Sequence, residues 1–468
     1  MKYAKALSFV AIGILVTGCA VGPDYQRPQF AMPVAYPETV KGVEQPIASD
    51  WWTLYGDNTL NMLVVEAIKQ NADIKIAAAQ IEEAEALLSQ ANSNIFPEID
   101  LGAGATRSRV SSAAAIPSLP PLVRDDRRVA ASTAFELDFW GKLRRATEAA
   151  RAQVLASTFG RDVVQLTLVA TTVQGYFTLR SLDAQLTVLE SNLKTRDDSL
   201  EVARNRAAAG LASDLDVNLA IGARADIASQ ITELERQRVI ALHLLALLTL
   251  NAKLDLPRGN LQSLPIPPVP PVGLPSALLD HRPDVRAAEQ GLIAANAQIG
   301  VAKAALFPTL SLTGAYGGQS AALENLLRSG SRIWSAGFGL ALPIFDAGRG
   351  LSKLDQVEAR QRQSLFIYQK TVAIAFREVA DAITNVNRSA ITETALQTRV
   401  DAARNSLELA QARYASGYSP YLDVLDAQRS ANDAELALVR NRQAQLGYSI
   451  DFMKSLGGGW SPPSLTKN

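Results

Sequence analysis

Two distant stretches of the chain carry the same pattern of residues, and this repetition limits the folds that are open to it. RAAAGLASDLDVNLAIG begins at Arg206 and RYASGYSPYLDVLDAQRS begins at Arg413, and a shift of 207 positions aligns their arginines, glycines and Leu-Asp-Val triplets. Upstream, the segment from Asn71 to Leu101 resembles the segment from Arg282 to Leu312 at a shift of 211. Similarity at a fixed shift is typical of one structural unit used twice. We therefore expect an internal two-fold sequence repeat.

Each copy of the first pattern predicts a helix that stops at a glycine and a second helix that starts after a short turn. Gly210 and Gly417 suit the left-handed position that ends a helix. Ser213 and Ser419 are expected as the N-caps of the following helices, with Pro420 in a first helical turn. The sequence thus predicts two helical hairpins with similar tips.

Two carboxylates follow the second tip. Asp423 and Asp426 are three residues apart and share one face of the predicted helix. Taken alone, they are equally consistent with ordinary first-turn acids that the helix dipole favours. Asp216, in the first copy, is expected to be such a helix-start acid.

The beginning of the chain resembles a secretory signal peptide. Lys2 and Lys5 precede an apolar run that is too short to span a bilayer as a helix. VTGC at the end of that run resembles a bacterial lipobox, so we predict cleavage before Cys19 and an N-acyl diacylglycerol (palmitate) anchor on its thiol. A plain signal peptide with an incidental cysteine is the alternative. Ala20 after the cysteine favours the outer membrane.

Charge and reactive residues exclude several functional classes. The chain has 46 basic and 46 acidic residues, so no basic excess points to nucleic acid. His243 and His281 are the two histidines and lie far apart in sequence, and Cys19 is the single cysteine, so no metal cluster or thiol nucleophile is predicted. The glycines near Gly102 lack the spacing of a phosphate loop. We therefore expect no enzyme and no cofactor apart from the lipid.

The period of the apolar residues predicts strands in both halves of the chain. Apolar residues alternate with small or polar ones at about 98–109 and 129–139, and again at about 309–318 and 333–343. Segments of roughly ten residues are long enough to cross a bilayer when they are tilted. The sequence thus predicts four membrane strands per chain.

Long proline-free stretches predict long helices. Each predicted strand pair ends at a glycine, Gly141 or Gly348, and the tip glycine follows 69 residues later. A continuous helix over that span is about 100 Å long, which implies a coiled-coil or tubular assembly. A 72–94 helix and a return helix together supply roughly 90 Å more, so two stacked helices match one long one.

These patterns divide the chain into segments. We expect a signal peptide at 1–18, a lipidated extended segment at 19–57, a first repeat at 58–250, a proline-rich connector at 251–281, a second repeat at 282–455 and a tail at 456–468. The long helices are expected at about 141–208 and 348–415, and the return helices at 214–250 and 419–455. The extended segment, the connector and the tail are expected to form a middle belt.

Four strands cannot close a barrel, and open sheet edges are not tolerated in lipid. Two chains would supply eight strands, which is too narrow for a channel, whereas three chains supply twelve. The fold class we expect is therefore an α+β membrane protein. It is a trimer whose 12-stranded outer-membrane β-barrel continues into a long periplasmic α-helical barrel.

At this point the chain resembles the outer-membrane factor family, most closely the lipid-anchored OprM-type channels of resistance-nodulation-division (RND) efflux pumps, and more distantly TolC. The resemblance covers essentially the whole mature chain. It rests on VTGC, PDYQRP at Pro23, FELDFWGKLRRA at Phe135, HRPDVRAAE at His281, IGVAKAALFPTLSLTG at Ile299, LPIFDAGR at Leu342, YLDVLDAQRS at Tyr421 and LGGGW at Leu456.

The resemblance implies a homotrimeric channel in the cell outer membrane with a large periplasmic extension. Such a channel passively conducts drugs, solvents or other small toxic compounds that it receives from a periplasmic adaptor and an inner-membrane RND transporter. It also implies a gate at the periplasmic helix tips, with adaptor docking on the tip turns. The implied gate residues are Leu422 as an apolar ring, Asp423 and Asp426 as acidic rings and Arg429 as a basic partner, and the implied docking residues are Arg206, Gly210, Arg413 and Gly417.

The first copy lacks part of the gate pattern, with Leu219 and Gly222 at the positions of Asp426 and Arg429. The second copy is therefore expected to carry the gate. Three alternatives remain open: a conduit for type I protein secretion, a conduit for metal efflux, and a structural lipoprotein that tethers the envelope. Bilayer-length strands argue against the tether, and no methionine cluster suggests copper or silver.

Overall fold

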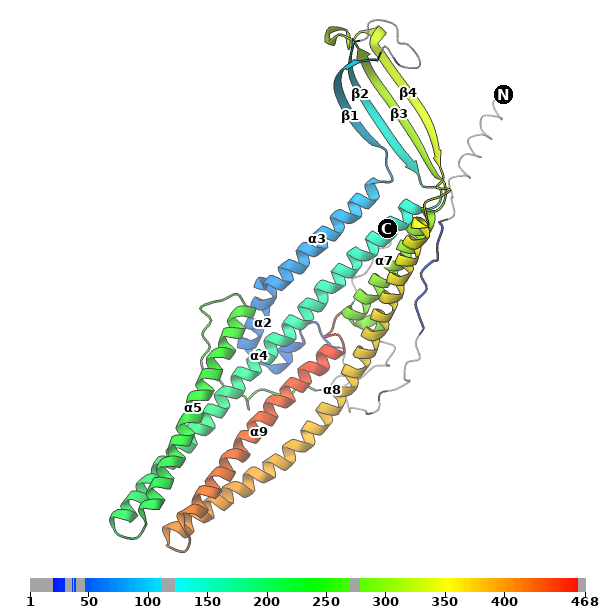
Figure 1. Cartoon of the computed structure of the whole chain (residues 1–468). Helices are drawn as coiled ribbons and strands as arrows, with labels where there is room; N and C mark the ends of the chain where they lie inside the picture. The colour runs from blue at the N-terminus through cyan, green and yellow to red at the C-terminus, as the bar shows by residue number, and fades with distance from the viewer. Residues whose placement is uncertain are drawn as a thin grey trace. The chain divides into compact units, whose positions relative to one another are not determined.

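The computed structural model of the chain describes residues 20–29, 36, 38, 47–111, 123–268 and 278–461 (Figure 1). The expected signal peptide and the expected lipid attachment site Cys19 lie outside the described residues. The chain separates into two compact units. The first comprises Met1–Gln29, Gln80–Thr158 and Ala287–Gln369, and the second comprises Phe30–Ala79, Phe159–Arg286 and Lys370–Asn468.

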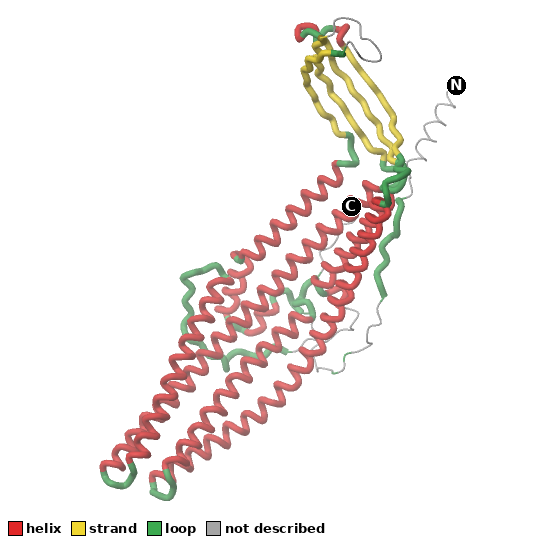
Figure 2. Tube along the Cα trace, in the orientation of Figure 1, coloured by secondary structure: helices red, strands yellow, loops and turns green. Residues whose placement is uncertain are grey.

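The first unit contains a four-stranded antiparallel sheet, drawn in yellow in Figure 2. Its order follows the chain, so that two hairpins join where the second strand pairs with the third, for example at Phe135 and Leu312. The strands are β1 Glu98–Arg109, β2 Val123–Leu137, β3 Thr309–Ser320 and β4 Arg332–Ala341.

Strand β2 differs from the expectation at both ends. It begins at Val123 rather than near 129, because its charged residues still pair with β1: Asp125 lies opposite Arg107, with 3.7 Å between their charged groups. The alternation of apolar residues could not predict this part of the strand, because backbone hydrogen bonds hold it to β1 and its side chains are charged. The strand ends at Leu137 because the carboxylate of Asp138 accepts the backbone N–H groups of Leu143 and Arg144, both at 2.9 Å, and so starts the next helix.

The segment after Cys19 is extended and lies against α4 (Lys142–Ala208) and α7 (Pro283–Ala304). Backbone N–H of Val21 donates to the carbonyl of Trp140 at 2.9 Å. Further along, Arg27 donates to both carboxylate oxygens of Glu289, at 2.6 and 2.8 Å. A Cβ on Gly22 would lie 2.6 Å from Cα of Gly300, so this contact requires the absence of a side chain. The segment is thus fixed to the first unit by specific contacts.

The long helices occur in matching pairs. α4 and α8 (Arg349–Ala415) have 67 residues each, and the return helices α5 (Asp214–Leu248) and α9 (Tyr421–Ser455) have 35 each. The helices that precede the strands, α3 (Ala72–Ser93) and α7, have 22 residues each. Both halves of the chain therefore present a helix, two strands, a long helix and a return helix in the same order. None of the described helices combines the length and the apolar character needed to cross a membrane.

One predicted helix start is wrong. α9 begins at Tyr421, and Pro420 occupies the cap position with an extended backbone (φ −69°, ψ 159°). Ser419 is therefore not the N-cap, because the fixed φ of proline suits the last residue before the helix as well as its first turn. In the first copy, Ser213 is the N-cap of α5 as predicted.

The second unit holds a belt of short elements around its long helices. The belt comprises η1 (Trp51–Tyr55), α2 (Asn58–Gln70), the connector 251–268 and α6 (Leu278–His281). Trp51 and Tyr55 are buried in a core with Tyr176 and Phe177 of α4 and Ile450 of α9. Burial of such large side chains contributes roughly 1.5–3 kcal/mol each.

A buried carboxylate ties the connector to α4 and α5. Asp183, 1% exposed, accepts from Arg180 at 3.0 Å, from Arg238 at 2.7 Å and from the backbone N–H of Gly259 at 3.0 Å. The same two guanidinium groups donate to the carbonyls of Pro257 and Leu256, both at 2.7 Å. Every charge in this cluster is therefore paired, as buried charges require.

Candidate gate at the hairpin tips

Both helical hairpins of the second unit end in the same type of turn (Figure 1). Gly210 has φ +72° and Gly417 has φ +80°, both in the left-handed region. The backbone N–H of the residue after each glycine reaches back to the carbonyl of Arg206 or Arg413, both at 2.8 Å. The N–H of each glycine also donates to a carbonyl of the last helical turn, at 2.9 Å for Gly210 and 3.0 Å for Gly417. A helix end with these two hydrogen bonds favours glycine, because a residue with a side chain in the left-handed conformation costs about 1–2 kcal/mol.

The predicted gate residues lie together on the first turns of α9. Leu422 is 54% exposed, and Asp423, Asp426 and Arg429 are also exposed. Arg429 donates to Asp426 across 3.2 Å. Because residues three, four and seven positions apart share a helix face, Leu422, Asp426 and Arg429 form one stripe, and Asp423 lies beside it. We call these four residues the gate stripe.

The opposite side of α9 is buried against the other hairpin. Tyr421 and Val424 lie in a small core with Leu200 and Ala203 of α4, and the rings of Tyr421 and Tyr414 are 5.2 Å apart. Burial raises the pKa of both tyrosines. This packing fixes which face of α9 remains outward, and the gate stripe is on that face.

Arg206 joins the two tips. Its guanidinium lies 4.8 Å from the centre of the Tyr414 ring and donates to the carbonyls of Tyr414 and Ala415, at 2.9 and 3.1 Å. These carbonyls belong to the last turn of α8, where a cation is favourable. The resemblance had implied adaptor docking for this residue, and the structure gives it a partner within the chain. No local pattern could have indicated the contact, because the partners lie in different copies.

Polar side chains between α4 and α9 continue the contact away from the tips. Gln428, 4% exposed, accepts from the guanidinium of Arg196 and donates to the hydroxyl of Ser199 at 2.9 Å. Asn192 donates to Asn432 at 2.7 Å. Burial lowers the pKa of Arg196. Such directional bonds set the rotation of α9 more sharply than apolar packing alone, and no local sequence pattern predicts them.

The first copy offers a weaker version of the stripe on α5. Leu215, which matches Leu422, is 65% exposed. Asp216 instead accepts the backbone N–H of Ser213 at 3.4 Å, as a helix-start acid does. Leu219 packs against the core of the tips. Within the described part of the chain, no three His, Cys, Asp or Glu side chains gather as a metal site would require.

Comparison with known proteins shows which family has this sequence and architecture. Residues 63–249 and 274–458 match the model of a family described as outer membrane efflux protein. The chain is 33% identical to the toluene efflux pump outer membrane protein TtgF of Pseudomonas putida, over 464 residues that cover 96% of each chain. It is 32% identical to the cation efflux system protein CusC of Escherichia coli, over 98% of this chain and 100% of CusC.

The solved structure of the outer-membrane channel OprN superposes with a TM-score of 0.88, over 95% of this chain and 100% of OprN, at 29% identity. The family that the sequence motifs suggested is therefore confirmed. OprN and the two relatives are outer-membrane channel or efflux proteins rather than enzymes. The chain belongs to the outer membrane efflux protein family.

Proposed function

We propose that this chain is the outer-membrane exit duct of a tripartite efflux pump and conducts drugs, solvents or other small toxic compounds passively to the exterior. The observation that carries this proposal is the gate stripe, held outward on α9 by the buried contacts of Tyr421 and Gln428 with α4. Acids in a first helical turn are favoured by the helix dipole in any case, but a stripe that also carries the exposed Leu422 beside the Asp426–Arg429 pair suits the wall of a narrow pore.

Three copies of the chain would form the duct. Within the described residues, β1 and β4 each pair on one side only, so four strands leave two open edges. Three sheets joined edge to edge give a closed barrel of twelve strands, which removes the open edges. The four paired long helices of each copy would then form the wall of a periplasmic tunnel.

The gate would act through both charge and dewetting. In each copy Arg429 pairs with Asp426, and within the described part of the chain Asp423, close by, has no ion-pair partner. Three such stripes around one axis are net negative and favour cations, while a ring of three Leu422 side chains can close a pore by excluding water. Movement of α8 and α9 away from the axis would open it, with partner binding favouring the open state.

The partners would be a periplasmic adaptor at the tip turns and an inner-membrane RND transporter behind it. The tips offer Arg206, Gly210, Arg413 and Gly417, and they also expose Leu211 and Tyr418, at 70% and 80%. Exposed apolar side chains at a turn are suited to a protein contact. Lipid attachment at Cys19 would anchor each copy to the outer membrane, next to the segment that the first unit holds in place.

The cargo is inferred to be organic rather than metallic. Identities of 33% to a toluene efflux protein and 32% to a cation efflux protein do not separate the two classes. The described residues include no metal-binding cluster. The described part of the duct thus suits compounds that need only a passage.

Single-channel conductance in planar bilayers tests this proposal. We expect a low, cation-preferring conductance that rises in the double variant Leu422→Ala/Asp426→Ala, because both the apolar ring and a carboxylate ring are lost. The matched control is Leu215→Ala, which removes the equivalent exposed leucine of the first copy. A wide pore in the unaltered protein would remove the gate, and no conductance in any variant would reject the duct.

A further inference from the structure

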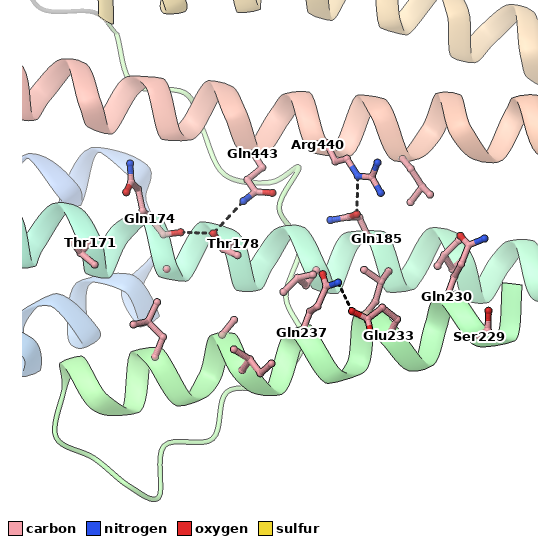
Figure 3. A pocket seen from close by; sticks show the side chains of 18 residues that line it. Thr171, Gln174, Thr178, Gln185, Ser229, Gln230, Glu233, Gln237, Arg440 and Gln443 are labelled. Atoms are coloured by element: carbon pink, nitrogen blue, oxygen red, sulfur yellow. Dashed lines mark hydrogen bonds between the residues drawn. The ribbon is translucent and has the colours of Figure 1, made fainter. Parts of the chain in front are cut away.

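A groove of about 950 Å³ lies within the second unit, between α4, α5 and α9 (Figure 3). α4 forms its floor, and the other two helices form its sides. Figure 3 shows amides and hydroxyls from all three helices in it, including Gln174, Thr178, Gln237 and Gln443. The groove lies beyond the gate stripe along α9, and the proposed gate does not use it.

On α9 the groove continues the face of the gate stripe. Leu436, Arg440 and Gln443 line the groove, and steps of three or four residues connect them with Leu422 and Asp426. Residues at such steps share one face of a helix. The side of α9 that carries the proposed gate is therefore also the side that faces the groove.

The belt contacts the opposite side of α9. Arg442 donates to the carbonyl of Leu264 in the connector at 2.7 Å, and Ser449, seven residues on, shares a hydrogen bond of 2.7 Å with Tyr55. Arg442 is two residues from Arg440, which is about 200° around the helix. The belt and the groove thus lie on opposite sides of α9.

The same division holds on α4. Thr171, Thr178 and Gln185 are spaced by seven residues and face the groove. Arg180 and Asp183, each two residues from one of these, bond instead to the connector. The contacts of α9 and of α4 therefore lead to the same conclusion: the belt lies on one side of these helices, and the groove opens on the other.

We propose that this groove lines the lumen of the duct and is a binding site for uncharged, amphiphilic cargo in transit. This inference rests on the proposed function, because the gate stripe defines which side of α9 faces the lumen. A partner protein that approaches from the belt side cannot reach the groove. A volume of about 950 Å³ is at the upper end of small-molecule sites, which span roughly 300–1,000 Å³.

The lining favours neutral molecules with one apolar and one polar end. Its apolar part includes Leu182, Leu189 and Leu244, and the rest is mostly amide and hydroxyl. Among the described residues that line it, Glu233 and Arg440 carry charge. Both are already engaged.

Glu233 accepts from Arg236 at 2.5 Å and from Gln237 at 2.8 Å, while Arg440 donates to Gln185 at 3.2 Å. Glu233 is thus paired with a guanidinium, and because the lining holds one acidic and one basic side chain, it is neutral overall and offers little net attraction to an ionic ligand. The amides can exchange their present bonds, such as Gln443 to Thr178 at 3.1 Å, for bonds to a passing molecule. Such an exchange gives weak, reversible binding, which a conduit requires.

An introduced cysteine tests both parts of the proposal, because the chain has only one cysteine of its own. Ser229→Cys places a thiol in the groove. Ser191→Cys is the matched control, since Ser191 is an exposed serine two residues from Leu189 and thus on the far side of α4. The unaltered channel controls for any reaction of Cys19.

The probe is a membrane-impermeant cationic thiol reagent, trimethylammonium-ethyl methanethiosulfonate, added to single channels in planar bilayers. We expect loss of conductance in discrete steps, one for each modified copy, in Ser229→Cys and not in Ser191→Cys. Chloramphenicol, a neutral amphiphile, is expected to slow the reaction of Ser229→Cys in a saturable manner.

The outcomes separate this inference from the proposed function. An unaltered channel that conducts, with Ser229→Cys insensitive to the reagent, overturns the lumenal groove but keeps the duct. Block of Ser229→Cys without protection by chloramphenicol overturns the binding site. Failure of every variant to conduct rejects the proposed duct itself.

Discussion

At the scale of single residues, Arg206 is one side chain that joins the two hairpin tips directly. Replacing it by alanine removes two charge-assisted hydrogen bonds to the end of α8 and the contact with the Tyr414 ring. We expect the second tip to lose about 1–2 kcal/mol of local stability. Hydrogen exchange of the Gly417 and Tyr418 amides, which close that turn, should then be roughly 5–30-fold faster.

Two further variants control this measurement. Arg206→Lys keeps the charge but loses the planar fork, so its exchange rates should lie between those of the alanine variant and the unaltered protein. Arg413→Ala removes the exposed arginine at the matched position of the other tip, and we expect little change. Equal acceleration in Arg206→Ala and Arg413→Ala would contradict the bridging role.

Residue identities predicted turns well and contacts poorly. Gly210 and Gly417 could be placed from sequence because a left-handed helix end restricts the choice of residue locally. The bridge from Arg206 to Tyr414 depends on the packing of two hairpins, which no local preference encodes. The contact of Gln428 with Arg196 was missed for the same reason.

At the scale of elements, Asp183 holds the connector onto α4 and α5. Replacing it by asparagine keeps the shape but leaves the buried guanidinium of Arg180 and the partly buried guanidinium of Arg238 without this counter-charge. Breaking a buried ion pair by removing one partner costs about 3–5 kcal/mol. We expect thermal unfolding of the helical part, followed by circular dichroism, to shift to lower temperature.

The exposed pair of Arg258 and Glu190 provides the matched comparison. It joins the same connector to the same helix across 2.7 Å, but both side chains are more than 40% exposed. Glu190→Gln should therefore change the stability by about 1 kcal/mol or less. Equal shifts for the two variants would show that burial does not decide the strength of this attachment.

The lengths of the helices and strands could be predicted from the sequence more accurately than the contacts between them. The absence of proline over long stretches and the period of apolar residues predicted helices whose observed ends, for example at Ala208 and Ala415, agree closely with the expected ones. The first part of strand β2 was not predicted, because Arg124 to Arg128 continue the backbone pairing without an apolar period. The sequence predicted which segments form the belt but not what they contact, because proline-rich segments have no apolar period from which contacts could be inferred.

At the scale of the whole molecule, the open sheet edges bear on the proposed assembly of three chains. β1 and β4 are the outer strands, so in a closed assembly β4 of one copy must pair with β1 of the next. Ala103 and Ala336 each lie five residues from the strand end next to the helices. Their positions in the strand pairing also place them on the same face of the sheet.

A double cysteine variant, Ala103→Cys/Ala336→Cys, tests this closure. A lipid-permeant bis-maleimide should link the two positions between neighbouring copies around the ring and yield a covalent trimer on denaturing gels. Each single variant should remain monomeric, because equivalent strands of different copies are separated by three others in a twelve-stranded barrel. A ladder that stops at the dimer, or continues beyond the trimer, contradicts closure by three chains. The same four strands per chain would then have to meet a different partner at their edges, since lipid does not satisfy an unpaired backbone.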